Sequence, residues 1–319
     1  MTNSVLSVII PNYNSAKQLI RTLKSYESIL SNRCNEVEFI IIDDNSSDDS
    51  YNVLTDFSET STLKIIVLKN EINEGPGPSR NKGINACNSS YLTFMDADDS
   101  FSNDFFEKII SVLKLNNYDC VLFNFYLVHN GKKKKKNQFL CKHLDEEPVD
   151  IITYCKGAPW GKVFRKSIVV NNKIVFLKQM QAEDVGFVKV ALSNCQSFYL
   201  LSDHLYNYYV ADKSLMRTEK HINPNNHVNA FFYIKDNINP KYDFLLEPIY
   251  YIEVIYDAGR LCSTVQNGSM WSNTIDNILS TYPCCFNKQY IKKLSFARKL
   301  LLWAIVRKKY KLVKFLSSF

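Results

Sequence analysis

The sequence predicts an α/β fold built on a largely parallel sheet. Short apolar segments alternate with amphipathic helical segments from the N-terminus onward. Each apolar segment also ends in a group of polar or turn-forming residues, as expected where a strand passes into a loop. Strands that alternate with helices in this way form βαβ units, and helices then cover both faces of the sheet.

The strands and helices of the first hundred residues can be assigned in order. We expect strands at Val5–Ile10, Val37–Ile42, Leu63–Leu68 and Tyr91–Met95. Ser15 is the expected N-cap of the first helix, Asp48 is suited to cap the second, and a third helix is expected from about Ser79 to Ala86. The polar residues that follow these strands should therefore meet at one edge of one sheet.

Three carboxylates follow the fourth strand within four residues: Asp96, Asp98 and Asp99. Ligands of open α/β sheets bind beyond the carboxyl ends of the strands, so Tyr13, Asp44 and this acidic cluster should share one crevice. Carboxylate oxygens suit Mg²⁺ or Mn²⁺, which take further ligands from water and substrate phosphates. The alternative is an ordinary helix start near Ser102, although three adjacent acids repel one another unless a cation is present.

Five motifs occur in an order that resembles a known family. They are Val8–Asn14 (VIIPNYN), Ile41–Asp48 (IIDDNSSD), Asn73–Gly83, Met95–Ser100 (MDADDS) and Ala182–Asp184. Weaker similarities lie at 159–167 and 205–216. Together they resemble the family 2 glycosyltransferases of the GT-A fold over about residues 4 to 216. The resemblance implies a GT-A mixed sheet flanked by helices, followed by a C-terminal helical region.

The resemblance also implies roles for individual residues. The residues implied to bind the nucleotide are Pro11, Tyr13, Asp44 as reader of the base, Arg80, Asp96 at the ribose or a metal-bound water, and Ala97. Asp98 is implied to ligate the metal that bridges the donor diphosphate. Asp184 is the implied catalytic base, at the start of an apparent helix whose N-terminus favours an ionised carboxylate.

Each assignment has a structural alternative. Asp44 could be a turn and capping residue, and Glu183 with Asp184 could be ordinary acids of a first helical turn. Trp160, Lys162 and Glu183 are candidate acceptor residues. However, a packing role is favoured for Trp160 over a sugar platform, and Lys162 could be a solvated surface lysine.

Length and composition indicate how the chain is divided. A chain of 319 residues with 46% apolar content can bury a sizeable core. We expect a nucleotide-sugar-binding half at 1–100, an acceptor-binding half at 101–216 and a helical region at 217–319. Apolar residues recur at helical spacing in 227–234, 244–261, 270–279 and 291–316.

The cysteines and the N-terminus favour a cytoplasmic protein. The nine cysteines are scattered without a Cys-x-x-Cys pair, so neither a zinc site nor a disulfide framework is expected. The first expected strand begins by Val5, which leaves no room for a signal peptide. No apolar run approaches the roughly 20 residues of a membrane-spanning helix.

Two basic segments stand out in a chain of net charge +7. Gly131–Lys136 is expected to be an exposed hairpin tip after a strand at Val121–Val128, and nucleic-acid binding is not expected from it. Residues 290–319 combine nine Lys or Arg with Trp303 and several leucines, a pattern typical of a helix on an anionic membrane surface. The alternative is a C-terminal helix packed on the body or on a second subunit.

The resemblance thus implies a metal-dependent, inverting glycosyltransferase that uses Mn²⁺ or Mg²⁺ and most readily a UDP-sugar. Its expected acceptor is a surface polysaccharide, an oligosaccharide or a lipid-linked glycan, and it is expected to be cytoplasmic or peripheral on the inner membrane face. One alternative is a catalytically silent nucleotide-sugar-binding or scaffold protein. The other is a nucleotidyltransferase, although Pro11–Asn14 offers no glycine-rich phosphate loop. A glycosidase is disfavoured because it needs neither a nucleotide pocket nor a metal cluster.

Overall fold

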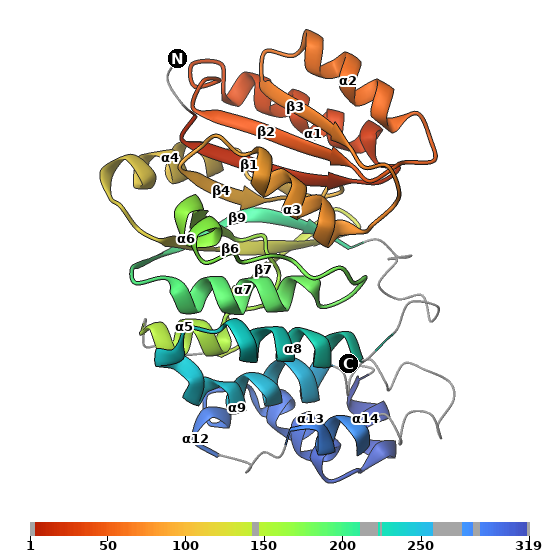
Figure 1. The fold of residues 1–319 in the computed structure, drawn as a ribbon, viewed down its shortest axis with the longest axis vertical. Coiled ribbons are helices and arrows are strands. Elements are labelled where there is room, and N and C mark those ends of the chain that lie inside the picture. Colours follow the sequence, from red (N-terminus) through yellow and green to blue (C-terminus); the bar gives the residue numbers. More distant parts are fainter. Residues whose placement is uncertain are drawn as a thin grey trace. The chain divides into compact units, whose positions relative to one another are not determined.

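The computed structural model describes residues 4–141, 147–210, 223, 225–257, 276–282 and 288–317. It divides into two compact units. Figure 1 labels their helices and strands. The first, here called the sheet unit, comprises Met1–Gln138, Ala158–Lys178 and Cys195–Ala211. The second, called the helical unit, comprises Phe139–Gly157, Gln179–Asn194 and Asp212–Phe319. Each unit is assembled from separate segments, so this division does not correspond to the predicted ranges 1–100, 101–216 and 217–319. Those ranges stay a prediction.

The sheet unit is a mixed sheet in the order β3-β2-β1-β4-β8-β6-β9-β5, with β7 paired to β6. Its strands are β1 (Leu6–Asn12), β2 (Val37–Asp43), β3 (Lys64–Lys69), β4 (Tyr91–Phe94), β5 (Ser100–Phe101), β6 (Cys120–His129), β7 (Lys132–Lys136), β8 (Lys162–Arg165) and β9 (Phe198–Tyr209). The first four run parallel, whereas β8 is antiparallel to both β4 and β6. The predicted α/β class is confirmed.

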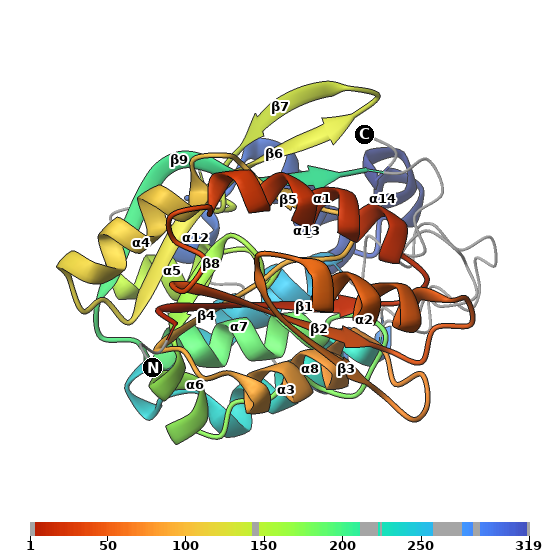
Figure 2. The same ribbon diagram turned by 90° about the horizontal axis from the view of Figure 1, so that it is seen from above.

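Helices cover both faces of the parallel part of the sheet. They are α1 (Ala16–Ile29), α2 (Ser50–Thr60), α3 (Pro76–Ala86), α4 (Phe105–Leu115) and α6 (Lys166–Asn171). Alternate residues of β1 point to opposite faces. Leu6, Val8 and Ile10 join the core beneath α1 and α4, whereas Ile9 faces Gly83 of α3. Figure 2 shows α1 and α3 on opposite sides of these strands.

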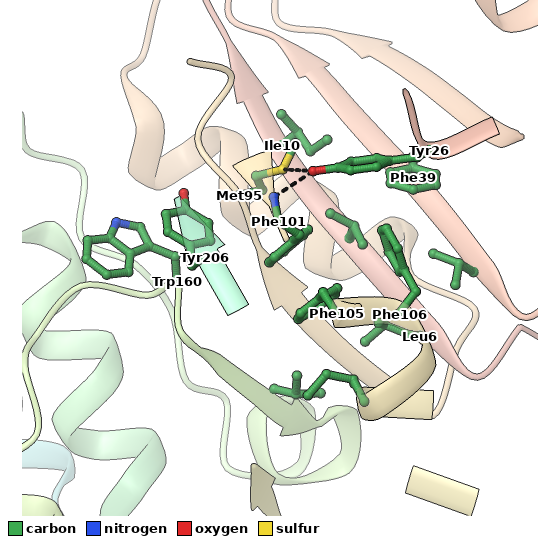
Figure 3. Packing of buried hydrophobic residues seen from close by; sticks show 14 of the residues in the cluster. Leu6, Ile10, Tyr26, Phe39, Met95, Phe101, Phe105, Phe106, Trp160 and Tyr206 are labelled. Carbon is green, nitrogen blue, oxygen red and sulfur yellow. Dashed lines mark hydrogen bonds between the residues drawn. The ribbon is translucent and has the colours of Figure 1, made fainter. Parts of the chain in front are cut away.

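The core on the α1 side is rich in aromatic rings (Figure 3). Phe101 stacks on Phe105 with ring centroids 3.7 Å apart, and Phe106 meets Tyr26 edge-on. The buried Tyr26 hydroxyl accepts a hydrogen bond from the Phe101 amide at 2.6 Å. This hydrogen bond therefore ties the short strand β5, which follows the acidic cluster, to helix α1.

Several element boundaries differ from the predictions, for identifiable reasons. Helix α3 begins at Pro76 because a proline is favoured in the first turn, where its missing N–H costs nothing. Helix α2 has Asp49 as its N-cap residue, although Asp48 still accepts a hydrogen bond from the Ser50 amide at 3.0 Å. The hairpin is confirmed, but its turn is Asn130–Gly131, both at positive φ, and the lysines form the strand β7 itself.

The helical unit contains α5 (Pro148–Tyr154), α7 (Glu183–Asn194), α8 (Asn225–Asn237), η3 (Pro240–Leu245), α9 (Leu246–Ile249), the π-helix η4 (Tyr250–Ile255), α12 (Lys288–Ile291), α13 (Phe296–Val306) and α14 (Tyr310–Ser317). The predicted helical stretch 270–279 lies partly outside the described residues. Helix α7 is buried on nearly every side. Within the described segments, no helix combines the length and the apolar character needed to cross a membrane.

The C-terminal segment is broken rather than forming one long helix from Tyr290. Ser295 begins α13 by accepting a hydrogen bond from the Arg298 amide at 3.4 Å. Lys308, at φ 54°, turns the chain out of α13 before α14 starts. The prediction of a single helix over this segment was therefore wrong.

Gly83 lets α3 approach the sheet closely, which gives a test of this packing. A Cβ at Gly83 would clash with the side chains of Ile9 and Ile42. We expect Gly83→Ala to lower the free energy of unfolding by about 1–3 kcal/mol, the usual cost of overpacking a core. Urea unfolding would measure it, with Asn85→Ala on the exposed side of α3 as the control. Equal stability of Gly83→Ala and the wild type would contradict this description.

Candidate active site

The parallel strands deliver a row of polar residues to one edge of the sheet unit. In the register, Asn12 pairs with Asp43 and Asp43 pairs with Lys69. The Asp44 amide then donates to the carbonyl of Asn12 at 2.8 Å, and the Met95 amide donates to Ile9. Residues that follow β1, β2, β3 and β4 therefore lie at the same edge, as the sequence predicted.

The Asp44 carboxylate organises the loop after β3. One of its oxygens accepts from Asn70 Nδ2 at 2.7 Å and from the Glu74 amide at 3.0 Å. The other accepts from the Gly75 amide at 2.7 Å. Asp44 is buried, so these three bonds offset the loss of water around its charge. Asp44 thus fixes the turn that leads into α3, although the helix itself has no side-chain cap. Its role with the base stays a prediction.

The loop after β1 is fixed to the loop after β2. The Asn14 side chain accepts from the Ser47 amide at 2.9 Å, while the Asn14 amide donates to the Ser46 hydroxyl at 3.0 Å. Tyr13, in the loop after β1, has a side chain that is 43% exposed, and Pro11 at the end of β1 is partly exposed. The two predicted pocket residues therefore present surface beside the buried carboxylate of Asp44.

Arg80 and Asp96 form an ion pair across the edge. Arg80 Nη2 donates to Asp96 Oδ1 at 2.9 Å, and the guanidinium lies 5.3 Å from the centre of the Phe176 ring. The Arg80 side chain is almost fully buried, whereas about a third of the Asp96 side chain is exposed. The structure therefore brings these two predicted residues together, with the Asp96 carboxylate at the surface. Ala97, the next residue, is buried.

Asp98 has the exposed carboxylate of the cluster. Its backbone carbonyl accepts a hydrogen bond from Gln18 Nε2 of α1 at 2.7 Å, which fixes the turn from one side. Although the Asp98 side chain is exposed, the protein atoms that partly enclose it and the adjacent Asp96 carboxylate raise its pKa. A divalent cation would reverse this effect, because it stabilises the ionised form.

Asp99 has a different role, which the sequence did not indicate. Its carboxylate is buried, accepts from the Tyr206 hydroxyl at 2.7 Å and accepts from the Tyr209 amide at 2.8 Å. The Tyr206 hydroxyl in turn accepts from the Asp96 amide at 3.2 Å. Burial, followed by the charges of Asp96 and Asp98, raises the pKa of Asp99 well above its usual value. Asp99 and Tyr206 together hold the turn that carries Asp96 and Asp98.

Trp160 and Lys162 are both buried in the sheet unit. Trp160 stacks on Tyr206 at a centroid distance of 4.8 Å and meets Phe125 edge-on, so only 8% of it is exposed (Figure 3). Lys162 is 0% exposed, and its ammonium donates to the Ala158 carbonyl at 2.6 Å. The alternative of a solvated Lys162 was therefore wrong. The packing role considered for Trp160 agrees with these contacts.

Glu183 and Asp184 form the first turn of α7 in the helical unit. Glu183 is buried, Asp184 is partly exposed, and one Asp184 oxygen accepts from the Val185 amide at 2.9 Å. The apolar residues that follow are buried, as predicted from their spacing: Val185, Phe187, Val188, Val190 and Ala191. The acidic pair is thus held at a helix N-terminus.

The acidic edge is suited to a metal bound together with a substrate. In the part of the chain that the structure describes, no group of three or more His, Cys, Asp and Glu side chains is arranged to hold a metal alone. Mg²⁺ and Mn²⁺ do not need such a group, because one or two carboxylates with water and substrate phosphates suffice. The exposed Asp98 beside Asp96 fits that arrangement.

Comparison with known proteins agrees with this geometry. Residues 7–169 match the family described as glycosyl transferase family 2. The chain is 24% identical over 284 residues to the uncharacterized glycosyltransferase YibD of Escherichia coli, covering 83% of this chain and 81% of that protein. It is 27% identical to a poly(ribitol-phosphate) beta-glucosyltransferase of Bacillus spizizenii, covering 70% of this chain but only 35% of that protein.

Solved structures share the fold. The crystal structure of residues 1–349 of S. aureus TarS in complex with UDP-GlcNAc matches with a TM-score of 0.74 at 20% identity, covering 98% of this chain and 90% of that one. A mannosyltransferase from Pyrobaculum calidifontis in complex with GDP-Man and Mn²⁺ matches with a TM-score of 0.58 at 13% identity, covering 100% and 85%. These matches support the predicted GT-A fold. The family match and the similar curated proteins favour a glycosyltransferase over the scaffold and nucleotidyltransferase alternatives. The chain therefore belongs to glycosyl transferase family 2, and it is a glycosyltransferase with a GT-A fold.

Proposed function

We propose that this glycosyltransferase moves a sugar, with inversion, from a nucleoside diphosphate donor to a hydroxyl of a growing glycan, and that it needs Mn²⁺ or Mg²⁺. The observation that carries the proposal is the exposed Asp98 carboxylate in a fixed turn beside the Arg80–Asp96 pair. The turn lies at the carboxyl edge of parallel strands, where α/β sheets bind ligands.

The donor is most readily a UDP-sugar. The TarS structure contains UDP-GlcNAc, and several similar curated proteins are named as glucosyl- or N-acetylglucosaminyltransferases. Pro11 and Tyr13 would flank the base. The two Asp44 oxygens offer about four acceptor positions, of which three are used, so one remains for the uracil imide N–H. Arg80, Asp96 and Ala97 would then lie along the ribose and phosphates.

The metal would be held by Asp98 together with the donor diphosphate. Held there, a divalent cation would supply Lewis-acid stabilisation of the charge on the departing diphosphate. Arg80 keeps the neighbouring Asp96 paired, which limits repulsion between the two carboxylates.

The chemical step needs a base for the acceptor hydroxyl, and we assign this role to Asp184. Its carboxylate takes the hydroxyl proton while the acceptor oxygen bonds to the anomeric carbon and the bond from that carbon to the diphosphate breaks. The N-terminus of α7 favours the ionised carboxylate that this step requires. Trp160 and Lys162 are buried in the sheet unit and Glu183 is buried in the helical unit, so we assign each of them to supporting the acceptor-binding surface of its own unit.

The acceptor class we propose is a surface polysaccharide, an oligosaccharide or a lipid-linked glycan. Similar curated proteins are named for poly(ribitol-phosphate) and for diacylglycerol. Such acceptors are often made at membranes, which would suit a cytoplasmic enzyme that associates with the inner membrane face.

Helix α13 has a surface that suits this association. Leu301, Leu302, Ala304 and Ile305 are buried on one side of the helix. The other side carries Phe296, 80% exposed, and Trp303, 44% exposed, with Leu300 and Arg307 at the same helical spacing. No acid follows Asp276 in the sequence, while ten Lys or Arg do. An exposed aromatic stripe among basic residues suits the interface of an anionic membrane.

The metal assignment is tested by Asp98→Asn. We expect isothermal calorimetry to show that wild-type protein binds UDP much more tightly with Mn²⁺ than with EDTA, and that Asp98→Asn loses most of this gain because a charged ligand is gone. Asp56→Asn, an exposed acid on α2, is the matched control. Equal UDP affinity of the wild type with Mn²⁺ and with EDTA would contradict the metal role.

The proposed role of Asp44 is tested by comparing nucleotides, because cytosine has no imide N–H. We expect the wild type to bind UDP more tightly than CDP, and equal affinity for the two would contradict the role of Asp44.

The base assignment is tested by Asp184→Asn. We expect this substitution to lower UDP release from UDP-sugars, with water as the acceptor, by roughly 10²- to 10⁴-fold, the usual contribution of a general base. Donor affinity should stay nearly unchanged, since a base acts in the transition state. Asp236→Asn, an exposed acid of α8 in the same unit, is the matched control and should retain most of the activity. Near wild-type turnover of Asp184→Asn would remove it from the mechanism.

The membrane assignment is tested by a double substitution, Phe296→Ser with Trp303→Ser. We expect wild-type protein to sediment with phosphatidylglycerol vesicles at low salt, and the double variant to lose this binding because its apolar anchors are gone. Phe232→Ser with Phe244→Ser, two exposed aromatics of the same unit, is the control and should bind like the wild type. A wild-type protein that ignores anionic vesicles at low salt would contradict the assignment.

A further inference from the structure

The strand β7 is a run of five lysines with no other residue, here called the lysine strand. Lys132 to Lys135 are exposed, and β7 pairs only with β6 among the described strands. Because side chains alternate along a strand, Lys132, Lys134 and Lys136 share one face, whereas Lys133 and Lys135 share the other. Same-face neighbours lie about 7 Å apart, so positive charge repeats regularly along both faces.

The register places the lysine strand at the same end of the sheet as the acidic turn. Leu122 of β6 pairs with Lys162 of β8, and β8 pairs with β4. The pairing of β6 with β8 ends at Leu122. Further along β6, Phe125 to His129 pair with the lysine strand. The irregular register against β9 around Asn124 bends β6 there. Figure 2 shows the β6–β7 hairpin as a projecting two-stranded ribbon.

Contacts link the lysine strand to the acidic turn through β9. The Lys133 ammonium donates to Asn207 Oδ1 at 2.9 Å, and Asn207 Nδ2 donates to the Ser100 hydroxyl at 3.1 Å. Ser100 directly follows Asp99, whose carboxylate accepts from the amide of Tyr209 in the same strand β9. The basic hairpin and the turn that carries Asp98 thus share a support.

A plainer explanation is that lysines protect an exposed strand edge from pairing with another chain. One or two lysines would suffice for that purpose, and they need not lie on both faces. Five uninterrupted lysines also repel one another, which costs stability unless an anion neutralises them. The acidic edge itself would repel an anionic acceptor. A basic surface near that edge would counteract this repulsion, which protection of a strand edge does not explain.

We propose that the lysine strand binds a polyanionic acceptor chain built with phosphodiesters and leads it toward the acidic edge. The inference rests on the proposed glycosyltransferase function and names the class of its acceptor. The regular spacing of the lysines suits a repeating anion, and the contact is electrostatic, so it should be strong at low salt and weak at high salt.

The experiment measures binding of a fluorescently labelled ribitol-phosphate oligomer by anisotropy. We expect binding that weakens steeply as salt rises, and a loss of about 10- to 100-fold in affinity at low salt in Lys132→Gln/Lys134→Gln/Lys135→Gln, from three lost charge contacts. The control Lys24→Gln/Lys235→Gln/Lys241→Gln removes the same charge from exposed lysines elsewhere and should stay within about threefold of the wild type.

The outcomes separate this inference from the proposed function. Equal losses in the two triple variants would overturn the inference, because only net charge would then matter. So would an oligomer that does not bind, or lysine-strand-dependent binding of phosphatidylglycerol vesicles without binding of the oligomer. UDP binding with Mn²⁺ is measured in the same samples, and the hairpin variant should retain it. If UDP fails to bind the wild type, the proposed function fails while oligomer binding still decides the acceptor surface.

Discussion

The candidate site depends on one buried hydrogen bond, from the Tyr206 hydroxyl to the Asp99 carboxylate. Three acids within four residues would repel one another, and the structure gives each a different environment. Asp99 is buried against Tyr206, and Asp96 is paired with Arg80. Only Asp98 presents its carboxylate to solvent without these supports. These supports reduce the repulsion within the turn. The negative charge that remains accessible is that of Asp98, where a cation can bind.

A second carboxylate, Asp44, fixes the neighbouring loop by accepting from two backbone amides and from Asn70. It is also the residue to which the base-reading role is assigned. Both functions use the same two oxygens, so the loop geometry and the nucleotide pocket are not independent. A change at Asp44 would alter the path of the chain toward α3 as well as any contact with a base. This coupling explains why a turn residue and a binding residue are hard to distinguish by pattern alone.

The edge of the sheet was predictable because strand periodicity and polar strand ends are local signals. The support of that edge was not, because Tyr206 lies 107 residues beyond Asp99 and nothing near either residue indicates the pairing. Lys162 shows the limit in another way, since a lysine is normally solvated and only the three-dimensional surroundings provide the Ala158 carbonyl that replaces water. The lysines after Gly131 were predicted as exposed, but their place in a strand depended on pairing with β6.

Within the helical unit, Lys189 of α7 has an ammonium that is fully buried and ion-paired with Glu253 at 2.8 Å. The same ammonium donates to the carbonyls of Ile152, Thr153 and Cys155 at the end of α5. Each residue of an α-helix turns by about 100°, so a bond network at Lys189 fixes the rotation of α7 about its own axis. Asp184 lies five residues before Lys189 in the same helix. The contacts of Lys189 on the buried side of α7 therefore fix the direction in which the Asp184 side chain points. A rotation of α7 that redirected Asp184 would have to break four charge-assisted contacts at once.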